Sequence, residues 1–178
     1  MSSKAKGKSW RRRIGSGFIY LLLIATVVTA VDLWRSRDLP TEVAALGSMT
    51  TLSGEIINLD AMSRQQPVLV YVWASWCGVC RVVSPMVDMV GAPHARVVSI
   101  AIASGPNARV SGYVREKGYD FAVVNDEDNR LAQILGVSVT PTLMVAYNGE
   151  LRFATAGITT LPGMVTRLWL ARLMDAIS

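Results

Sequence analysis

The sequence predicts an α/β domain preceded by an N-terminal transmembrane helix, and three observations lead to this prediction. Segments rich in β-branched residues alternate with segments whose apolar residues recur at helical spacing, which is typical of α/β proteins. Two late strand segments are joined by an Asn-Gly pair, which indicates an antiparallel hairpin. An uncharged apolar run precedes all of these segments and is long enough to cross a bilayer.

Composition limits the kind of protein this can be. With 178 residues, there is room for one domain of ordinary size plus extra segments. The two cysteines, Cys77 and Cys80, exclude a framework of structural disulfides and a four-cysteine zinc site, and the single histidine, His94, cannot complete a zinc ligand set. The net charge of +5 comes from six basic residues before residue 14, and the rest of the chain is nearly neutral. The charge distribution therefore does not indicate a nucleic-acid partner, because the expected domain carries no excess of basic residues.

The first 34 residues predict a membrane anchor. Residues 1–13 are a basic tail, and residues 14–34 are the expected transmembrane anchor, about as long as the ~30 Å bilayer core requires. The positive-inside rule places the tail in the cytoplasm and the rest of the chain outside it. A cleaved signal peptide is the alternative, because Val28-Thr29-Ala30 resembles a cleavage site, but the length of the apolar run favours the anchor.

Residues 35–49 show no helical or strand periodicity of apolar residues and are interpreted as a linker. Residues 50–178 are interpreted as the folded domain. The domain begins with a weak hairpin signal over residues 50–62. The uncharged, apolar run Val68–Ala74 is typical of a strand buried on both faces, and residues 81–90 carry apolar side chains at helical spacing.

Cys77 and Cys80 lie at the junction of this strand and this helix. We expect both cysteines in the first helical turn, where free N–H groups and the helix dipole favour a thiolate over a thiol. The thiolate is the form that attacks a disulfide. At this spacing the two sulfurs can reach each other, so that one attacks and the other resolves the mixed disulfide.

The remaining elements follow in alternation. We expect a strand at 96–104, a helix at 108–117, a strand at 119–124, a helix at 129–135, a hairpin at 142–156 and a closing helix at 161–177. The acidic residues 125–128 are interpreted as a helix N-cap region, with a calcium site as the weaker alternative. A proline entering an apolar strand removes a ladder donor, so we expect the Thr140–Pro141 bond to be cis.

The stretch WASWCGVC resembles the thioredoxin signature W-A-x-W-C-x-x-C. Pro85 matches the proline that kinks the thioredoxin helix, and VTPTLMVAYNG is similar to the cis-proline strand and hairpin of that family. The resemblance covers residues 50–178 and implies the thioredoxin-like fold, a central mixed sheet flanked by helices. The additional helix and strand over residues 107–125 resemble the TlpA/ResA-like branch. With its anchor, the chain is most similar to the suppressor of copper sensitivity D proteins, membrane-anchored disulfide oxidoreductases of the bacterial periplasm.

This resemblance implies a role for each matching residue. Cys77 would be the exposed attacking thiolate and Cys80 the more buried resolving thiol, and together they would form a redox-active disulfide. Trp76, Thr140 and Pro141 would contact the substrate chain, whereas Trp73 is interpreted as core. The family uses no cofactor and no resident metal. Its partners would be client proteins with disulfides or thiols and a membrane electron conduit of the DsbD/ScsB kind, with a link to copper tolerance or to cytochrome c and copper-protein maturation.

The chain departs from the family at three points. Tyr71 stands where thioredoxins have a buried acid, and Val83 stands where some ResA-like proteins have a glutamate. The base that deprotonates Cys80 would then be water or an acid distant in sequence, or resolution would be slow. The dipeptide Gly78-Val79 differs from those of thioredoxin and DsbA, and predicts a reduction potential between roughly −270 and roughly −120 mV.

Two other functions are compatible with the same pair. Two thiolates can hold Cu(I), but no methionine or histidine pair accompanies the cysteines, and Pro141 would lie across them. A redox-inert interaction module is the third interpretation, and the presence of both cysteines argues against it. The sequence favours exchange of dithiol and disulfide with client proteins.

Overall fold

A computed structural model of the chain describes residues 23, 42–91 and 96–177. The chain divides into two compact units, residues 1–37 and 38–178, and the second holds the folded domain. The expected basic tail, almost all of the expected anchor at 14–34, the cleavage-site alternative and His94 lie outside the described residues. Among the residues that are described, none belongs to a helix with the length and apolar character that crossing a membrane requires.

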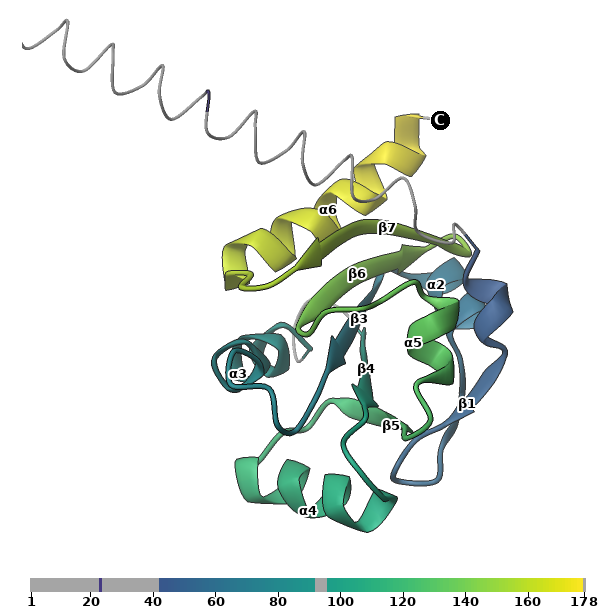
Figure 1. The fold of residues 1–178 in the computed structure, drawn as a ribbon. Helices are drawn as coiled ribbons and strands as arrows, with labels where there is room; N and C mark the ends of the chain where they lie inside the picture. The colour runs from purple at the N-terminus through teal and green to yellow at the C-terminus, as the bar shows by residue number, and fades with distance from the viewer. Residues whose placement is uncertain (1–22, 24–41, 92–95, 178) are drawn as a thin grey trace, which may run out of the picture. The chain divides into compact units, whose positions relative to one another are not determined.

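The domain is built on a five-stranded mixed sheet with strand order β5-β4-β3-β6-β7 (Figure 1). The central strand β3 (Val68–Trp73) pairs in parallel with β4 (Arg96–Ile102), which pairs in parallel with β5 (Ala122–Asp126). On its other side β3 is antiparallel to β6 (Thr142–Tyr147), which forms a hairpin with β7 (Glu150–Ala156). The expected mixed sheet and the hairpin are confirmed.

Helices cover both faces of the sheet, because alternate residues of β3 supply two apolar clusters. Tyr71 and its neighbours pack against α3 (Cys80–Gly91), α4 (Asn107–Lys117) and α6 (Leu161–Ile177). The other face of β3, which includes Val70, packs against shorter elements that include α2 (Leu59–Gln65) and α5 (Arg130–Ile134). Every residue of β3 is buried, as its uninterrupted apolar sequence predicts.

The folded domain begins earlier than expected. A short 3-10 helix, Val43–Leu46, and strand β1 (Ser48–Thr50) place Val43, Leu46 and Met49 in the core. The interpretation of residues 43–49 as linker is therefore wrong, because a four-residue helix offers no periodicity to recognise. β1 forms an antiparallel hairpin with β2 (Ile56–Asn58), which confirms the weak hairpin signal.

Two other elements differ from the prediction. Helix α2 was not expected, and it begins where the Asn58 side chain accepts a hydrogen bond from the Ala61 N–H. β5 begins three residues later than expected, because the carboxylate of Asp88 on α3 binds the backbone N–H groups of Asp120 and Phe121 at 2.8 and 3.2 Å. The closing helix α6 has the expected bounds, and its Trp169 is exposed.

The tip of the β6–β7 hairpin is tied to the start of the domain. The Gly149 N–H donates to Ser63 Oγ at 3.0 Å, and the Val43 N–H donates to the Gly149 carbonyl at 3.0 Å. Gly149 has φ +78°, and a Cβ there would approach a carboxylate oxygen of Asp60 to 2.8 Å, so glycine is needed at this position. Because Ala146 pairs with Val68 at the start of β3, this tip lies at the end of the sheet away from the cysteines.

Candidate active site

Cys77 and Cys80 form a disulfide between the end of β3 and the start of α3, with their Cα atoms 5.3 Å apart. Cys80 is the first residue of α3, and Cys77 lies in the turn that precedes it. The expectation that both cysteines lie in the first helical turn is therefore wrong for Cys77. The Cys77 N–H donates to the Ala74 carbonyl at 3.1 Å, and this bond turns the chain back after β3.

The start of α3 is directed at the sulfur of Cys77. The Cys80 N–H donates to Cys77 Sγ at 3.1 Å. It is one of the N–H groups that have no partner within the helix, and it lies at the positive end of the helix dipole. When the pair is reduced, the same donor stabilises a thiolate on Cys77 more than a thiol.

The two cysteines differ in exposure, but both are buried. Cys77 is 6% exposed and Cys80 is 1% exposed. The greater exposure of Cys77 agrees with its expected role as the attacking cysteine and with Cys80 as the resolving one. Cys77 is nevertheless less accessible than the resemblance implied. The reason is that its side chain belongs to the same apolar cluster as Trp73 and Val83.

The two tryptophans next to the pair have different environments. Trp76 is 61% exposed, and its indole Nε1–H donates to the Ala103 carbonyl at 2.9 Å. Trp73 is fully buried and donates to Ser99 Oγ at 3.1 Å, so its interpretation as a core residue is confirmed. Trp76 therefore presents a fixed aromatic surface beside Cys77.

The Thr140–Pro141 bond is cis, as expected. Thr142 pairs with Val72 near the end of β3, which places the cis bond at the edge of the sheet from which the cysteine turn emerges. The Pro141 carbonyl accepts a hydrogen bond from the Gly157 N–H at 2.8 Å, so this carbonyl is engaged within the protein. Thr140 is partly exposed and Pro141 is buried.

Exposed apolar residues accompany these elements, and sequence reasoning did not identify them. Val79, between the cysteines, is 42% exposed, and Val139, next to Thr140, is 55% exposed. Ile158, which follows the Gly157 bonded to Pro141, is 67% exposed. Val79 and Val139 could have been noticed in the sequence, because each is an apolar residue directly beside a motif residue. An exposed position more often carries a polar side chain.

Tyr71 occupies the position of the missing acid and is fully buried. Its hydroxyl lies 2.9 Å from Ser84 Oγ and donates to the Cys80 carbonyl at 3.4 Å. Burial raises the pKa of Tyr71 well above its ordinary value, and the hydrogen bond with Ser84 opposes this only in part. The phenol therefore stays protonated at neutral pH and is not the base that deprotonates Cys80.

Within the acidic stretch 125–128, the side chain of Asp126 caps the start of helix α5. The carboxylate of Asp126 is buried and accepts hydrogen bonds from the Leu131 and Ala132 N–H groups at 3.1 and 2.9 Å. These donors belong to the first turn of α5, so the N-cap interpretation is confirmed.

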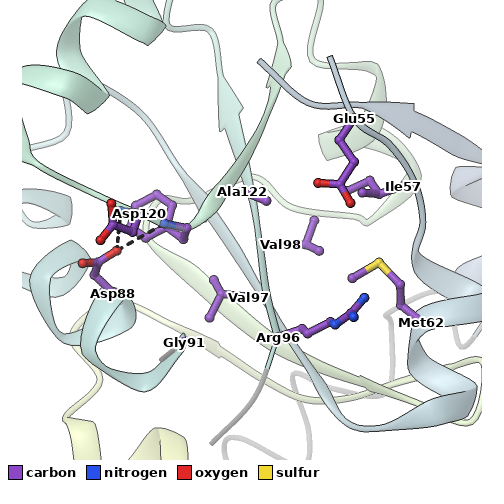
Figure 2. A pocket seen from close by; sticks show the side chains of 11 residues that line it. Glu55, Ile57, Met62, Asp88, Gly91, Arg96, Val97, Val98, Asp120 and Ala122 are labelled. Atoms are coloured by element: carbon purple, nitrogen blue, oxygen red, sulfur yellow. Dashed lines mark hydrogen bonds between the residues drawn. The ribbon is translucent and has the colours of Figure 1, made fainter. Parts of the chain in front are cut away.

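A hollow of about 430 Å³ lies at the other end of the sheet (Figure 2). Its lining includes Arg96 and Val98 from the start of β4, and Arg96 pairs with Val68, the first residue of β3. The cysteines follow the last residue of β3, so this hollow takes no part in their chemistry.

Comparison with known proteins agrees with this geometry. Residues 41–157 match the model of the AhpC/TSA family. A thioredoxin-like protein of Haemophilus influenzae is 29% identical over 161 residues, covering 90% of this chain and 96% of that protein. The thiol:disulfide interchange protein DsbE of Escherichia coli is 31% identical over 106 residues, covering 58% of this chain and 57% of DsbE.

A secreted disulfide oxidoreductase of Mycobacterium tuberculosis, homologous to Escherichia coli DsbE, superposes with a TM-score of 0.59. The superposition covers 69% of this chain and 94% of that protein at 21% identity, which supports the thioredoxin-like fold. Because the family model spans more than half of the sequence and the fold agrees, this chain belongs to the AhpC/TSA family of the thioredoxin superfamily.

Proposed function

We propose that this protein is a thiol-disulfide oxidoreductase that exchanges dithiol for disulfide with client proteins through Cys77 and Cys80. The observation that carries the proposal is the hydrogen bond from the Cys80 N–H to Cys77 Sγ at the start of α3. This bond selects Cys77 as the sulfur that is stabilised as a thiolate, and the disulfide with Cys80 supplies the resolving partner.

In the reductive direction, the Cys77 thiolate attacks one sulfur of a client disulfide. The client S–S bond breaks, a mixed disulfide with Cys77 forms, and the second client sulfur leaves as a thiolate that takes up a proton. Cys80 then loses its proton and attacks Cys77 Sγ. The client leaves as a dithiol, and two electrons have moved from the cysteine pair to the client.

The proton of Cys80 goes to water in this scheme. Among the described residues, no hydrogen bond joins a carboxylate to Cys80, and the buried Tyr71 is already protonated. Val83, at the position of the glutamate of some ResA-like proteins, contributes no titratable group. Resolution by Cys80 is therefore expected to be slower than attack by Cys77.

We also propose that the domain works outside the cytoplasm, anchored by residues 14–34 in a bacterial inner membrane. The basic tail and the apolar run support this location, as does the similarity to DsbE and to a secreted oxidoreductase. A cysteine pair without a cofactor needs a protein partner to restore its redox state. A membrane electron conduit of the DsbD/ScsB kind is the partner we propose.

The proposed clients are proteins whose thiols handle copper or haem, as the similarity to the suppressor of copper sensitivity D proteins suggests. Copper titration of the reduced protein addresses the alternative Cu(I)-transfer function. Tight binding that Cys77→Ala abolishes, in a protein unable to reduce disulfides, would favour copper transfer. Disulfide reduction without tight copper binding would favour exchange.

Trapping of mixed disulfides tests the proposal. In Cys80→Ser, Cys77 still attacks clients but the mixed disulfide is not resolved, so cells expressing this variant should accumulate adducts that a reductant releases. Cys77→Ser lacks the attacking sulfur and is the matched control. Adducts of equal amount in both variants, or in neither, would contradict the assigned roles.

The direction of exchange follows from the redox state of the pair in intact cells. Alkylation of free thiols before lysis separates reduced from oxidised protein by mass. A mostly reduced pair indicates a reductase, and a mostly oxidised pair indicates an oxidase.

A further inference from the structure

A groove of about 730 Å³ lies beside the cysteine pair. One wall comes from the cysteine turn and the start of α3, with Trp76 and Arg81. The other wall is one face of α4, with Arg109, Tyr113, Glu116 and Lys117. Trp76 directly precedes Cys77 and Arg81 directly follows Cys80, so the groove shares a wall with the reactive turn.

The charge of the groove is positive. Glu116 is paired with Lys117 at 2.9 Å, and Lys117 Nζ lies 5.8 Å from the centre of the Tyr113 ring. Arg81 and Arg109 are exposed, and neither guanidinium makes a hydrogen bond or ion pair with the part of the chain that the structure describes. Lys117 and, to a smaller extent, the charge of Arg81 lower the pKa of Glu116, so Arg109 is the guanidinium most available to an anion from outside.

The aromatic residues of the groove are held in place before anything binds. The hydrogen bond from Trp76 to the Ala103 carbonyl fixes an indole that is 61% exposed. The Tyr113 ring packs against the buried Trp73 with 5.6 Å between ring centres. Fixed aromatic side chains lose little conformational entropy when a partner covers them, so this surface suits recognition of a polypeptide.

We propose that this groove receives an acidic segment of the client polypeptide next to the client's reactive disulfide, an inference that rests on the proposed function. A client joined to Cys77 lies against Trp76, and its flanking residues reach Arg81 and Arg109 from there. Guanidinium groups bind carboxylates with two parallel hydrogen bonds, which makes them selective for aspartate and glutamate side chains. The partner is thus a protein with acidic residues flanking its disulfide.

Synthetic peptides test this inference with the full chain in detergent. Three peptides of equal length carry one internal disulfide each, flanked by aspartates, by serines or by lysines. The reduced protein should reduce the acidic peptide about tenfold faster than the basic one at low salt, with the neutral peptide between them. This ratio should approach one at about 0.5 M salt, because screening shortens the range of the charges.

Two charge reversals on α4 test whether the preference for the acidic peptide arises in the groove. Arg109→Glu reverses a charge in the groove without touching a neighbour of either cysteine, and should bring the acidic-to-basic ratio to about one or below. Arg115→Glu is the matched control, because Arg115 is exposed on α4 but does not line the groove, and it should keep the ratio of the unmodified protein.

The outcomes distinguish a failure of the acidic-segment inference from a failure of the proposed thiol-disulfide exchange. Reduction of all three peptides at equal rates would overturn the acidic-segment inference alone. Equal loss of the ratio in both variants would also overturn it, because the whole charged surface and not the groove would then be responsible. Failure to reduce any peptide would refute the proposed function and the inference with it.

Discussion

The hydroxyl of Tyr71 lies 2.9 Å from the hydroxyl of Ser84, in a buried position next to the resolving cysteine. Tyr71 comes from the central strand, and Ser84 lies one helical turn after Cys80 on α3. The two hydroxyls are hydrogen-bonded to each other, and neither carries a charge at neutral pH. A neutral pair thus occupies the place at which thioredoxins carry an acid.

Tyr71→Phe should cost about 1 kcal/mol of unfolding free energy, since the net worth of one hydrogen bond is of this size. Ser84 Oγ can turn to the carbonyl of Cys80 in its own helix, which limits the loss. The rate of disulfide exchange should change less than about twofold, because a protonated phenol does not accept the proton of Cys80. Urea unfolding and a fluorescent disulfide substrate measure the two effects, and a tenfold slower exchange would contradict the assignment.

Alkaline pH should destabilise the protein through Tyr71. The folded pKa of Tyr71 lies above its unfolded value of about 10, so its contribution is fully present below pH 10 and is lost as pH rises toward the folded value. The unfolding free energy of the unmodified protein relative to that of Tyr71→Phe should fall by up to about 1.4 kcal/mol per pH unit above 10, so that the advantage of about 1 kcal/mol reverses at about pH 11. Urea midpoints between pH 8 and about 11 measure this, and parallel curves for the two proteins would refute it.

Asp126→Ala should destabilise the domain by about 2–4 kcal/mol, because two buried N–H groups at the start of α5 lose their acceptor. Glu127→Ala removes an exposed carboxylate from the same acidic stretch and should stay within about 0.5 kcal/mol. Thermal or urea unfolding of both variants gives the comparison. Equal effects would mean that Asp126 acts through its charge and not as a cap.

The reduction potential should lie between roughly −270 and roughly −120 mV, since Gly78-Val79 stabilises the Cys77 thiolate less than the dipeptide of DsbA. Val79→His should raise the potential, because an imidazolium between the cysteines favours the reduced, ionised form. Equilibration of the full chain with glutathione buffers and alkylation of the free thiols gives both values. A potential outside this interval, or a lower one in Val79→His, would contradict the prediction.

Local sequence patterns predicted much of the sheet and the cysteine junction. The run Val68–Ala74 identified a strand buried on both faces, and Asn148-Gly149 identified the hairpin, because each pattern has few other structural solutions. Helix α2 and the short helix at Val43 were missed because they are held by contacts distant in sequence, such as the Ser63–Gly149 bond.

Sequence patterns pointed to the candidate site where its residues form a contiguous motif, and missed the parts that are assembled in space. Cys77, Trp76 and Pro141 follow from recognisable patterns. The contact of Ser84 with Tyr71 depends on how α3 packs against the central strand. The groove exists because α4 lies beside the cysteine turn, which no local pattern reveals. The burial of Cys77 was not foreseen, because it results from packing against residues that the motif does not contain.

The bond between Val43 and Gly149 has a mechanical consequence. A force applied to the chain upstream of residue 43 enters the domain through the hairpin tip and spreads along the hydrogen bonds of β6 and β7. The turn that carries the disulfide lies at the opposite end of these strands and bears little of the load. Pulling on the chain upstream of residue 43 is therefore expected to load the hairpin tip and to leave the spacing of the two sulfurs undisturbed.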